Sequence, residues 1–375
     1  MKLAIAIPTY NRVDKLKKNI ESIDAQVVST GVEVSLVVAN TYSNDETQAY
    51  LETLKINREN FFCYNQKESS KYCNLGKLAA TIPTGVDWVW LMGDDDYLIN
   101  EGSIQKVYET ITAIEPGENL SYVHACQARR SKNTGDVYVD NCLSLCNAFG
   151  YLDTFGWFSS QIVRRDIFCE TLQQHQKYFD NQHFTLGLPI HTSSAFLHCS
   201  FFLQNLWNKK GAIIDLPLVE TQDEMQTQST IERWQEEKAA DRYMCVVDDL
   251  FRLKTSGVPL TNLEAKFFRY HQYHLWDRLI NRQLAVQFSV AKGKDIELAE
   301  IGVSEYETNW KRIKKLSLLL GDAILRRYLD SVVEQSIEIS SLYIKSGFDN
   351  KIERLLIKQS EICNRHSYEF YVCNQ

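Results

Sequence analysis

The sequence lacks several features that would place it in particular protein classes. It contains no apolar run approaching the roughly 20 residues that a membrane-spanning helix needs. It also lacks a basic excess, since 41 Lys and Arg residues stand against 48 Asp and Glu residues, for a net charge of −7. Nucleic-acid binding depends on basic surface, so no nucleic-acid partner is expected. There is no C-x-x-C pair, and the ten cysteines are expected to be free thiols.

The amino-terminal apolar segment, residues 3–7, is too short for the core of a signal peptide and is followed by Pro8. The expected localisation is therefore cytoplasmic. A length of 375 residues predicts two domains, or one large domain with an extension.

The first third of the chain alternates between strand-like and helix-like patterns. The expected strands are residues 3–7, 32–39, 61–64 and 87–92. A helix with Leu16, Ile20 and Ile23 facing inward is expected after the first strand, and further helices at residues 45–54 and from residue 75 to 80. Residues 3–7 are continuously apolar, which is typical of a strand buried on both faces of a parallel sheet. This alternation predicts right-handed βαβ units and an α/β fold with a doubly wound, mostly parallel sheet.

The rest of the chain is less regular. Residues 121–128, 135–139, 156–163 and 212–216 are predicted as strands, and residues 195–207 as a helix. From about residue 225 the apolar residues recur at helical spacing among many charges, which predicts a C-terminal helical extension. We therefore expect an α/β domain over residues 1–220, which would carry the functional site, and a helical domain over residues 221–375.

Three polar segments directly follow expected strands: residues 8–12, 40–45 and 93–96. In doubly wound sheets, ligands bind beyond the carboxyl ends of the strands. The third segment contains Asp94, Asp95 and Asp96, whose like charges repel one another unless a cation neutralises them. Mg²⁺ and Mn²⁺ bind carboxylate and phosphate oxygens together, so the triplet predicts a divalent metal site. The alternative is a solvated acidic turn that caps the next helix.

The chain resembles the GT-A glycosyltransferases of family 2 in four segments. These are Ile5-Ala6-Ile7-Pro8-Thr9-Tyr10-Asn11-Arg12; Val37-Val38-Ala39-Asn40 with Ser43-Asn44-Asp45-Glu46-Thr47; Asn74-Leu75-Gly76; and Trp90-Leu91-Met92-Gly93-Asp94-Asp95-Asp96. The resemblance is good to about residue 110, faint to about residue 220 and absent beyond.

The resemblance implies a GT-A fold and a nucleotide-sugar donor. The residues that it places at the nucleotide are Pro8, Thr9, Tyr10, Arg12, Asn40, Lys71, Asn74, Asp94 and Asp95. Asp96 and Asp94 match the DxD motif, with Asp96 as the main ligand of Mn²⁺ or Mg²⁺. Asn40 replaces an Asp that contacts the base in the family. An amide can donate as well as accept, so a UDP-sugar is expected but other bases stay open.

An inverting transfer needs a base near the acceptor hydroxyl. Asp180 is the first candidate, with His183 and His191 next and Asp153 as a further alternative. Each of these residues also fits an ordinary surface or core role. The aromatic residues Trp157, Phe158 and Trp207 fit either sugar stacking or the core.

The expected acceptor is a glycan or a lipid-linked sugar, in the synthesis of a bacterial surface polysaccharide, lipooligosaccharide or glycoprotein glycan. The basic residues Lys311, Arg312, Lys314 and Lys315 precede an apolar run and fit peripheral contact with the inner face of the membrane, or simply a solvated helix face. Two other functions stay open. A sugar-nucleotide pyrophosphorylase would need a Gly-rich loop after the first strand, which is absent here. A non-catalytic interaction protein would not need the intact Asp triplet.

Overall fold

The computed structural model describes residues 1–27, 31–65, 75–128, 130–181, 197–222, 246–260, 263 and 267. The chain divides into two compact units. The first contains residues 1–146, 153–190 and 198–231, and the second contains residues 147–152, 191–197 and 232–375. The three polar segments predicted to form a site all belong to the first unit.

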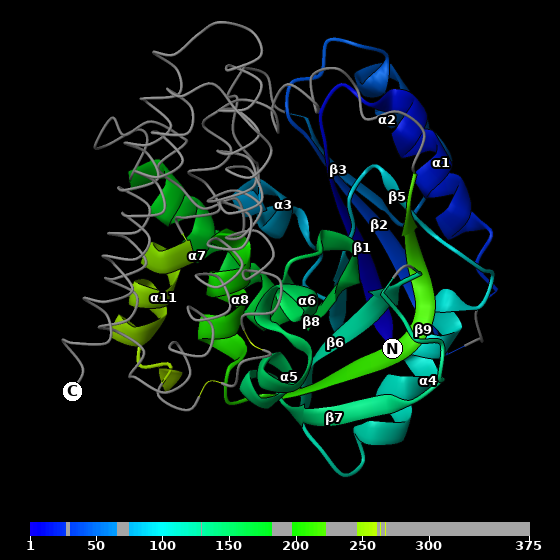
Figure 1. Cartoon of the computed structure of the whole chain (residues 1–375). Coiled ribbons are helices and arrows are strands. Elements are labelled where there is room, and N and C mark those ends of the chain that lie inside the picture. The colour runs from blue at the N-terminus through cyan, green and yellow to red at the C-terminus, as the bar shows by residue number, and fades with distance from the viewer. Residues whose placement is uncertain are drawn as a thin grey trace, which may run out of the picture. The chain divides into compact units, whose positions relative to one another are not determined.

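The first unit is built around a mixed sheet (Figure 1), in which the described strands follow the order β3-β2-β1-β4-β8-β6-β9-β5, with β7 also paired to β9. The strands are β1 (Lys2–Thr9), β2 (Glu33–Asn40), β3 (Phe61–Asn65), β4 (Trp88–Leu91), β5 (Asp96–Leu98), β6 (Leu120–Gln127), β7 (Val137–Asn141), β8 (Gln161–Arg164) and β9 (Lys210–Thr221). Strands β3, β2, β1 and β4 are all parallel, so their carboxyl ends meet at one edge. Strand β8 runs antiparallel to both β4 and β6.

The helices of the first unit connect and cover these strands. They are α1 (Val13–Asp24), α2 (Thr47–Asn57), α3 (Leu75–Thr81), α4 (Ser103–Ile114), α5 (Cys142–Phe149), α6 (Tyr151–Phe155), α7 (Arg165–Asp180) and α8 (Leu197–Leu206), of which α5, α6 and α8 each include residues of the second unit. A short 3-10 turn, η1 (Phe158–Ser160), precedes β8.

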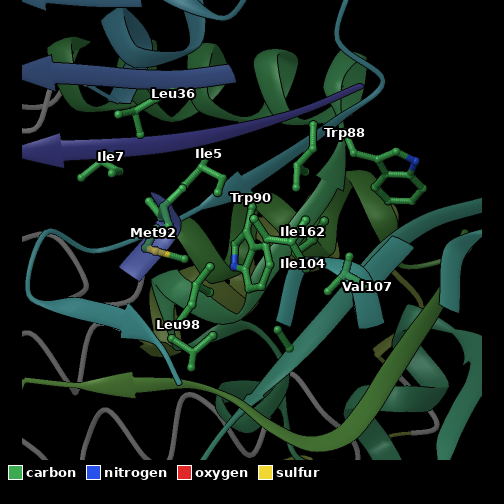
Figure 2. Close-up of a cluster of buried hydrophobic side chains, with 14 of the residues drawn as sticks. Ile5, Ile7, Leu36, Trp88, Trp90, Met92, Leu98, Ile104, Val107 and Ile162 are labelled. Atoms are coloured by element: carbon green, nitrogen blue, oxygen red, sulfur yellow. The ribbon is translucent and has the colours of Figure 1, made fainter. Parts of the chain in front are cut away.

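The main hydrophobic core lies on one face of the parallel strands (Figure 2). Ile5 and Ile7 of β1 belong to the same buried cluster as Trp90 of β4 and Ile104 and Val107 of α4. Successive residues of a strand point to opposite faces, so the alternate residues face the other side. Those on β1 are alanines, Ala4 and Ala6, which are fully buried where α3 packs against the sheet.

Helices α7 and α3 pack against each other in antiparallel directions. The Cys169 thiol, early in α7, donates a hydrogen bond to the Ala79 carbonyl late in α3, over 3.5 Å. Gly76, at the start of α3, lies against Gln176, near the end of α7. The backbone amide of Arg165 bonds the Asp87 carbonyl just before β4, so α7 starts at the amino edge of the parallel strands. It therefore ends, at Asp180, toward the carboxyl edge.

The predicted α/β fold is confirmed, and the expected strands of the first third are found within one or two residues. The strand predicted at residues 156–163 was wrong in its first part. Residues 158–160 form the 3-10 turn, and only residues 161–164 form β8. The described cysteines are free thiols, as expected: Cys63, Cys126, Cys142, Cys146, Cys169 and Cys199.

Of the predicted C-terminal helical region, the structure describes helix α11 (Val246–Thr255) in the second unit. It is followed by Gly257, whose φ of 87° is a left-handed conformation that suits glycine at a helix end. The rest of that region, including the basic cluster at residues 311–315, lies outside the described residues. Within the described ranges, no helix is both long and apolar enough to cross a membrane.

Candidate functional site

The three polar segments come together at the carboxyl edge of the parallel strands. They form the loop between β1 and α1, the loop between β2 and α2, and the turn between β4 and β5, which we call the acidic turn (residues 93–96). Parallel strands place their carboxyl ends side by side, so the order of strands brings these loops together.

The loop after β1 binds the carboxylates of the acidic turn. The Thr9 hydroxyl donates to Asp94 Oδ2 over 2.8 Å. Arg12 Nη1 lies 2.9 Å from both Asp94 Oδ1 and Asp95 Oδ2. Burial alone would lower the pKa of Arg12, but the two carboxylates raise it. The guanidinium thus partly neutralises two of the three acidic side chains, and both oxygens of Asp94 are bonded to protein donors.

Asp96 has different surroundings. Its side chain is buried, and its Oδ2 accepts a hydrogen bond from the Ser159 hydroxyl. The same hydroxyl accepts the backbone N–H of Gly93 over 2.8 Å. Burial raises the pKa of Asp96 to about 7, the bond from Ser159 opposes that rise, and the nearby Asp95 adds to it. A carboxyl group in this position gains stability as an anion when a cation comes close.

Two carboxylate oxygens converge beside Gly93. A Cβ atom on Gly93 would lie 3.1 Å from both Asp95 Oδ1 and Asp96 Oδ2, so the glycine leaves the space between them open. A hard divalent cation fits these oxygens if a phosphate-bearing ligand and water supply its other ligands. Within the described ranges, no group of three or more His, Cys, Asp or Glu side chains is arranged so that it could hold a metal ion by itself.

The loops after β1 and β2 are joined by hydrogen bonds. The Asn11 N–H donates to the Ser43 hydroxyl over 2.9 Å, and Asn11 Oδ1 accepts the Asn44 N–H over 2.8 Å. Asn11 and Tyr42 both have a φ of 51°, in the left-handed region that non-glycine residues seldom occupy. Such strained residues persist only where their surroundings hold them, as they do in many ligand sites. The Tyr10 and Tyr42 side chains are about half exposed here.

Asn40 is buried beneath the second loop. Its Oδ1 accepts both the backbone N–H of Ser43, over 3.3 Å, and the Ser43 hydroxyl, over 2.5 Å. A backbone N–H is always a donor, so the amide oxygen must point toward Ser43. The amide nitrogen then points toward Asn65 and donates to its Oδ1 over 3.2 Å. Asn40 therefore joins β2 to β3 and to its own loop.

The other residues expected at the nucleotide are placed as follows. Pro8 is partly exposed at the end of β1, where it pairs with Ala39 of β2. Lys71 and Asn74 lie outside the described residues.

Of the four candidate bases, Asp180 and Asp153 lie within the described residues. Asp180 ends α7, is partly buried and accepts a hydrogen bond from Gln176 Nε2 over 2.7 Å. Asp153 is ion-paired with Arg130, whose guanidinium lies 4.8 Å from the centroid of the Trp157 ring. His183 and His191 lie outside the described residues.

Several residues at the acidic turn were not foreseen from the sequence, among them Ser159 and Asn19. Ser159 bonds both ends of the turn but belongs to a segment predicted as a strand, and no sequence signal marks it. Asn19 donates hydrogen bonds to the carbonyls of Gly93 and Asp96, over 2.9 and 2.6 Å. A signal for Asn19 did exist, because it is a polar residue among the buried positions of α1.

Comparisons with known proteins find one matching family model and several similar solved structures. The family model described as glycosyl transferase family 2 matches residues 4–170. A crystal structure of S. aureus TarS 1–349 in complex with UDP-GlcNAc has a TM-score of 0.52 at 13% identity, and the alignment covers 100% of this chain and 93% of that one. The mannosyltransferase PcManGT from Pyrobaculum calidifontis, in complex with GDP-Man and Mn²⁺, has a TM-score of 0.45 at 8% identity, with 100% and 88% covered. No curated protein sequence matches at a significant level.

At 13% identity the likeness to TarS concerns the fold alone. The family match adds a likeness in sequence over residues 4–170, which include most of β1, all of β2 and β4, the acidic turn and Ser159. Residues 4–170 of this chain belong to glycosyl transferase family 2.

Proposed function

We propose that this protein is a metal-dependent glycosyltransferase that moves a sugar, a hexose or a related one, from a UDP-sugar to a glycan or lipid-linked acceptor with inversion. The observation that carries the proposal is the acidic turn at the carboxyl edge of the sheet. There, Thr9 and Arg12 hold Asp94 and Asp95, while Asp96 lies buried beside the space left by Gly93.

On the donor side, Asp95 and Asp96 would hold Mn²⁺ or Mg²⁺. Asp94, for which the sequence also predicted this role, already has both oxygens bonded to Thr9 and Arg12. A bound divalent cation would neutralise charge that develops on a leaving diphosphate. Arg12, a quarter exposed, would face the same phosphates as a second cationic group. A uridine nucleotide is supported by the fold-level likeness to TarS, a structure that contains UDP-GlcNAc.

On the acceptor side, Asp180 would remove the proton of the attacking hydroxyl. Its support is its place at the end of α7 toward the carboxyl edge, the edge that carries the acidic turn. A base must come within hydrogen-bond reach of that hydroxyl once the acceptor is bound. His183 and His191 follow Asp180 closely in the sequence and are the next candidates.

The biological setting belongs to the same proposal. The acceptor would be a precursor of a bacterial surface polysaccharide, lipooligosaccharide or glycoprotein glycan, used on the cytoplasmic side of the membrane. We propose residues 1–220 as the catalytic domain and the helical region of residues 221–375 as the part that contacts the membrane, through the basic cluster at Lys311, Arg312, Lys314 and Lys315.

A thermal-shift screen tests the proposal. The full-length chain is heated with UDP-, GDP-, CDP- and ADP-sugars, each with Mn²⁺ and with EDTA. A ligand that binds only the folded state raises the melting temperature, so at least one donor should do so with Mn²⁺ and not with EDTA. No shift with any donor contradicts the proposal. A shift that is equal in EDTA contradicts the metal dependence.

A further inference from the structure

Asn19 is a polar residue in an apolar setting. It lies in the middle of α1, and the buried residues that share its side of the helix are Leu16, Ile20 and Ile23. Its side chain has no exposed surface. Asn is a weak helix former, and burying an amide is unfavourable unless its polar atoms are hydrogen-bonded. Its presence therefore calls for a compensating interaction.

That interaction is with the backbone at both ends of the acidic turn. Asn19 Nδ2 donates to the Gly93 carbonyl over 2.9 Å and to the Asp96 carbonyl over 2.6 Å. Rotating the amide by half a turn would place its oxygen against two carbonyl oxygens, so this orientation is the favourable one. Asn19 Oδ1 is buried and has no hydrogen-bond partner among the described residues. The Asn19 amide thus uses its nitrogen to bond the acidic turn, while its oxygen stays buried without a hydrogen bond from any described residue.

Asn19 is part of a polar row along α1. Arg12, at the start of the helix, binds the carboxylates of the acidic turn from the more exposed side. Ser22, one turn after Asn19, accepts the Leu98 N–H over 3.1 Å. Gln26, just beyond the helix, bonds Asn100 and Ile104, over 2.7 and 3.1 Å. Of these four residues, Arg12 and Asn19 are the ones that form hydrogen bonds to residues 93–96.

We infer that Asn19 is a positioning residue for the donor site. By holding the Gly93 and Asp96 carbonyls from the buried side, it sets the shape of the turn and the placement of the Asp95 and Asp96 carboxylates. The inference rests on the proposed function, because it gives those carboxylates the task of binding a metal–diphosphate ligand.

The experiment compares UDP binding in the presence of Mn²⁺ by titration calorimetry for the wild type, Asn19→Leu and Gln26→Met, all as full-length chains. Leu has the branched shape of Asn and suits the apolar surroundings. Gln26→Met is the matched control, since it removes hydrogen bonds of the same row that do not reach the acidic turn. Asn19→Leu should raise the Kd by roughly tenfold or more, the effect of losing the equivalent of one or two hydrogen bonds. Gln26→Met should leave the Kd within about twofold, whatever its melting temperature.

Asn19→Ala is measured alongside, because it removes both hydrogen bonds without adding an apolar side chain, and the same rise in Kd is expected. A folded Asn19 variant with the wild-type Kd overturns the inference while the proposed function stands. If both Asn19 variants fail to fold and Gln26→Met folds, Asn19 is required for stability alone, and the inference is overturned. If the wild type itself does not bind UDP with Mn²⁺, the proposed function fails and the inference fails with it.

Discussion

At the scale of single residues, the three carboxylates of the acidic turn have different partners. Asp94 is almost fully buried and bonded through both oxygens to Thr9 and Arg12. Asp95 is about one-third exposed and accepts a hydrogen bond from Arg12 through its Oδ2. Asp96 is buried against Ser159. Burial raises the pKa of Asp94, and Arg12, which lies against both Asp94 and Asp95, opposes that rise and offsets the repulsion between the two neighbouring carboxyl groups.

Replacing Arg12 with Ala should destabilise the fold. The variant leaves a buried carboxylate without its counter-charge, which costs about 2 kcal/mol, between the values typical of exposed and of buried ion pairs. Urea unfolding measures the difference. The control is Lys2→Ala, which removes an ion pair with Glu33 that is more than half exposed, and it should change stability by less than about 0.5 kcal/mol. Equal losses in the two variants would contradict the role of Arg12.

Replacing Asp180 with Asn should separate donor binding from transfer. The amide oxygen can still accept the bond from Gln176, so the fold is preserved. Removal of a general base typically lowers the rate by about 10²–10⁴-fold, while UDP-sugar binding with Mn²⁺ should be unchanged. Glu170→Gln is the matched control, because Glu170 accepts a similar bond from Gln174 earlier on the same helix. Full turnover by Asp180→Asn would move the assignment to His183 or His191.

At the scale of elements, α3 and α7 can pack closely because Gly76 has no side chain. A Cβ atom on Gly76 would lie only 2.7 Å from the Cβ of Gln176. Neither atom can move without its backbone, so a larger residue would force the two helices apart. The pair also holds the end of α7, which carries Asp180, relative to the sheet.

Gly76→Ala should therefore lower the free energy of unfolding by about 1–3 kcal/mol, the usual cost of overpacking, even though Ala is the better helix former. Gly85→Ala is the control, since nothing lies within 4 Å of a Cβ there, and it should be neutral or slightly stabilising. Both are measured by urea unfolding. A Gly76→Ala variant as stable as Gly85→Ala would contradict this packing.

Strand β6 carries a buried histidine that should make the fold sensitive to acid. Burial lowers the pKa of His124 to about 4, while its hydrogen bond to the Thr154 carbonyl opposes that shift. An unfolded His titrates near about 6.5. Between pH 4 and pH 6.5, His124 therefore binds a proton in the unfolded chain but not in the folded chain. The stability that this group contributes is complete above pH 6.5 and is lost as the pH falls toward 4.

The expected loss from His124 is about 3 kcal/mol over that range, at roughly 1.4 kcal/mol per pKa unit. The His124→Gln side chain cannot titrate and can still bond Thr154. Between pH 7 and pH 4, the free energy of unfolding of this variant should therefore fall by about 3 kcal/mol less than that of the wild type. Other acid-sensitive groups, such as His198, are present in both proteins and cancel in the comparison. Parallel pH profiles for the two proteins would contradict a depressed pKa at His124.

At the scale of the whole molecule, the direction of the strands assembles the site. This much could be predicted from the sequence, because an apolar run such as residues 3–7 followed by polar residues indicates both a buried parallel strand and the place where it ends. The order of β3, β2, β1 and β4 then brings Arg12 to Asp94 across 82 positions of sequence.

The hydrogen bonds that Ser159 and Asn19 make to the acidic turn could not be predicted from the sequence, for a physical reason. Ser159 reaches Asp96 only because β8 runs antiparallel beside β4, a pairing between distant segments. The residues just before β8 form a 3-10 turn that alternation of apolar residues does not reveal. Asn19 was visible as a polar residue on an apolar helix face, but its partners are backbone carbonyls, which carry no sequence signal.

The most direct test of the central claim is titration calorimetry of UDP into the full-length chain with Mn²⁺, using the wild type and Asp96→Asn. The substitution preserves the shape of the side chain and removes its negative charge. The wild type should bind UDP in Mn²⁺ and much more weakly in EDTA, and Asp96→Asn should lose the difference between the two conditions. Absence of wild-type binding, or an Asp96→Asn variant with the full Mn²⁺ effect, would contradict a metal–diphosphate site at the acidic turn.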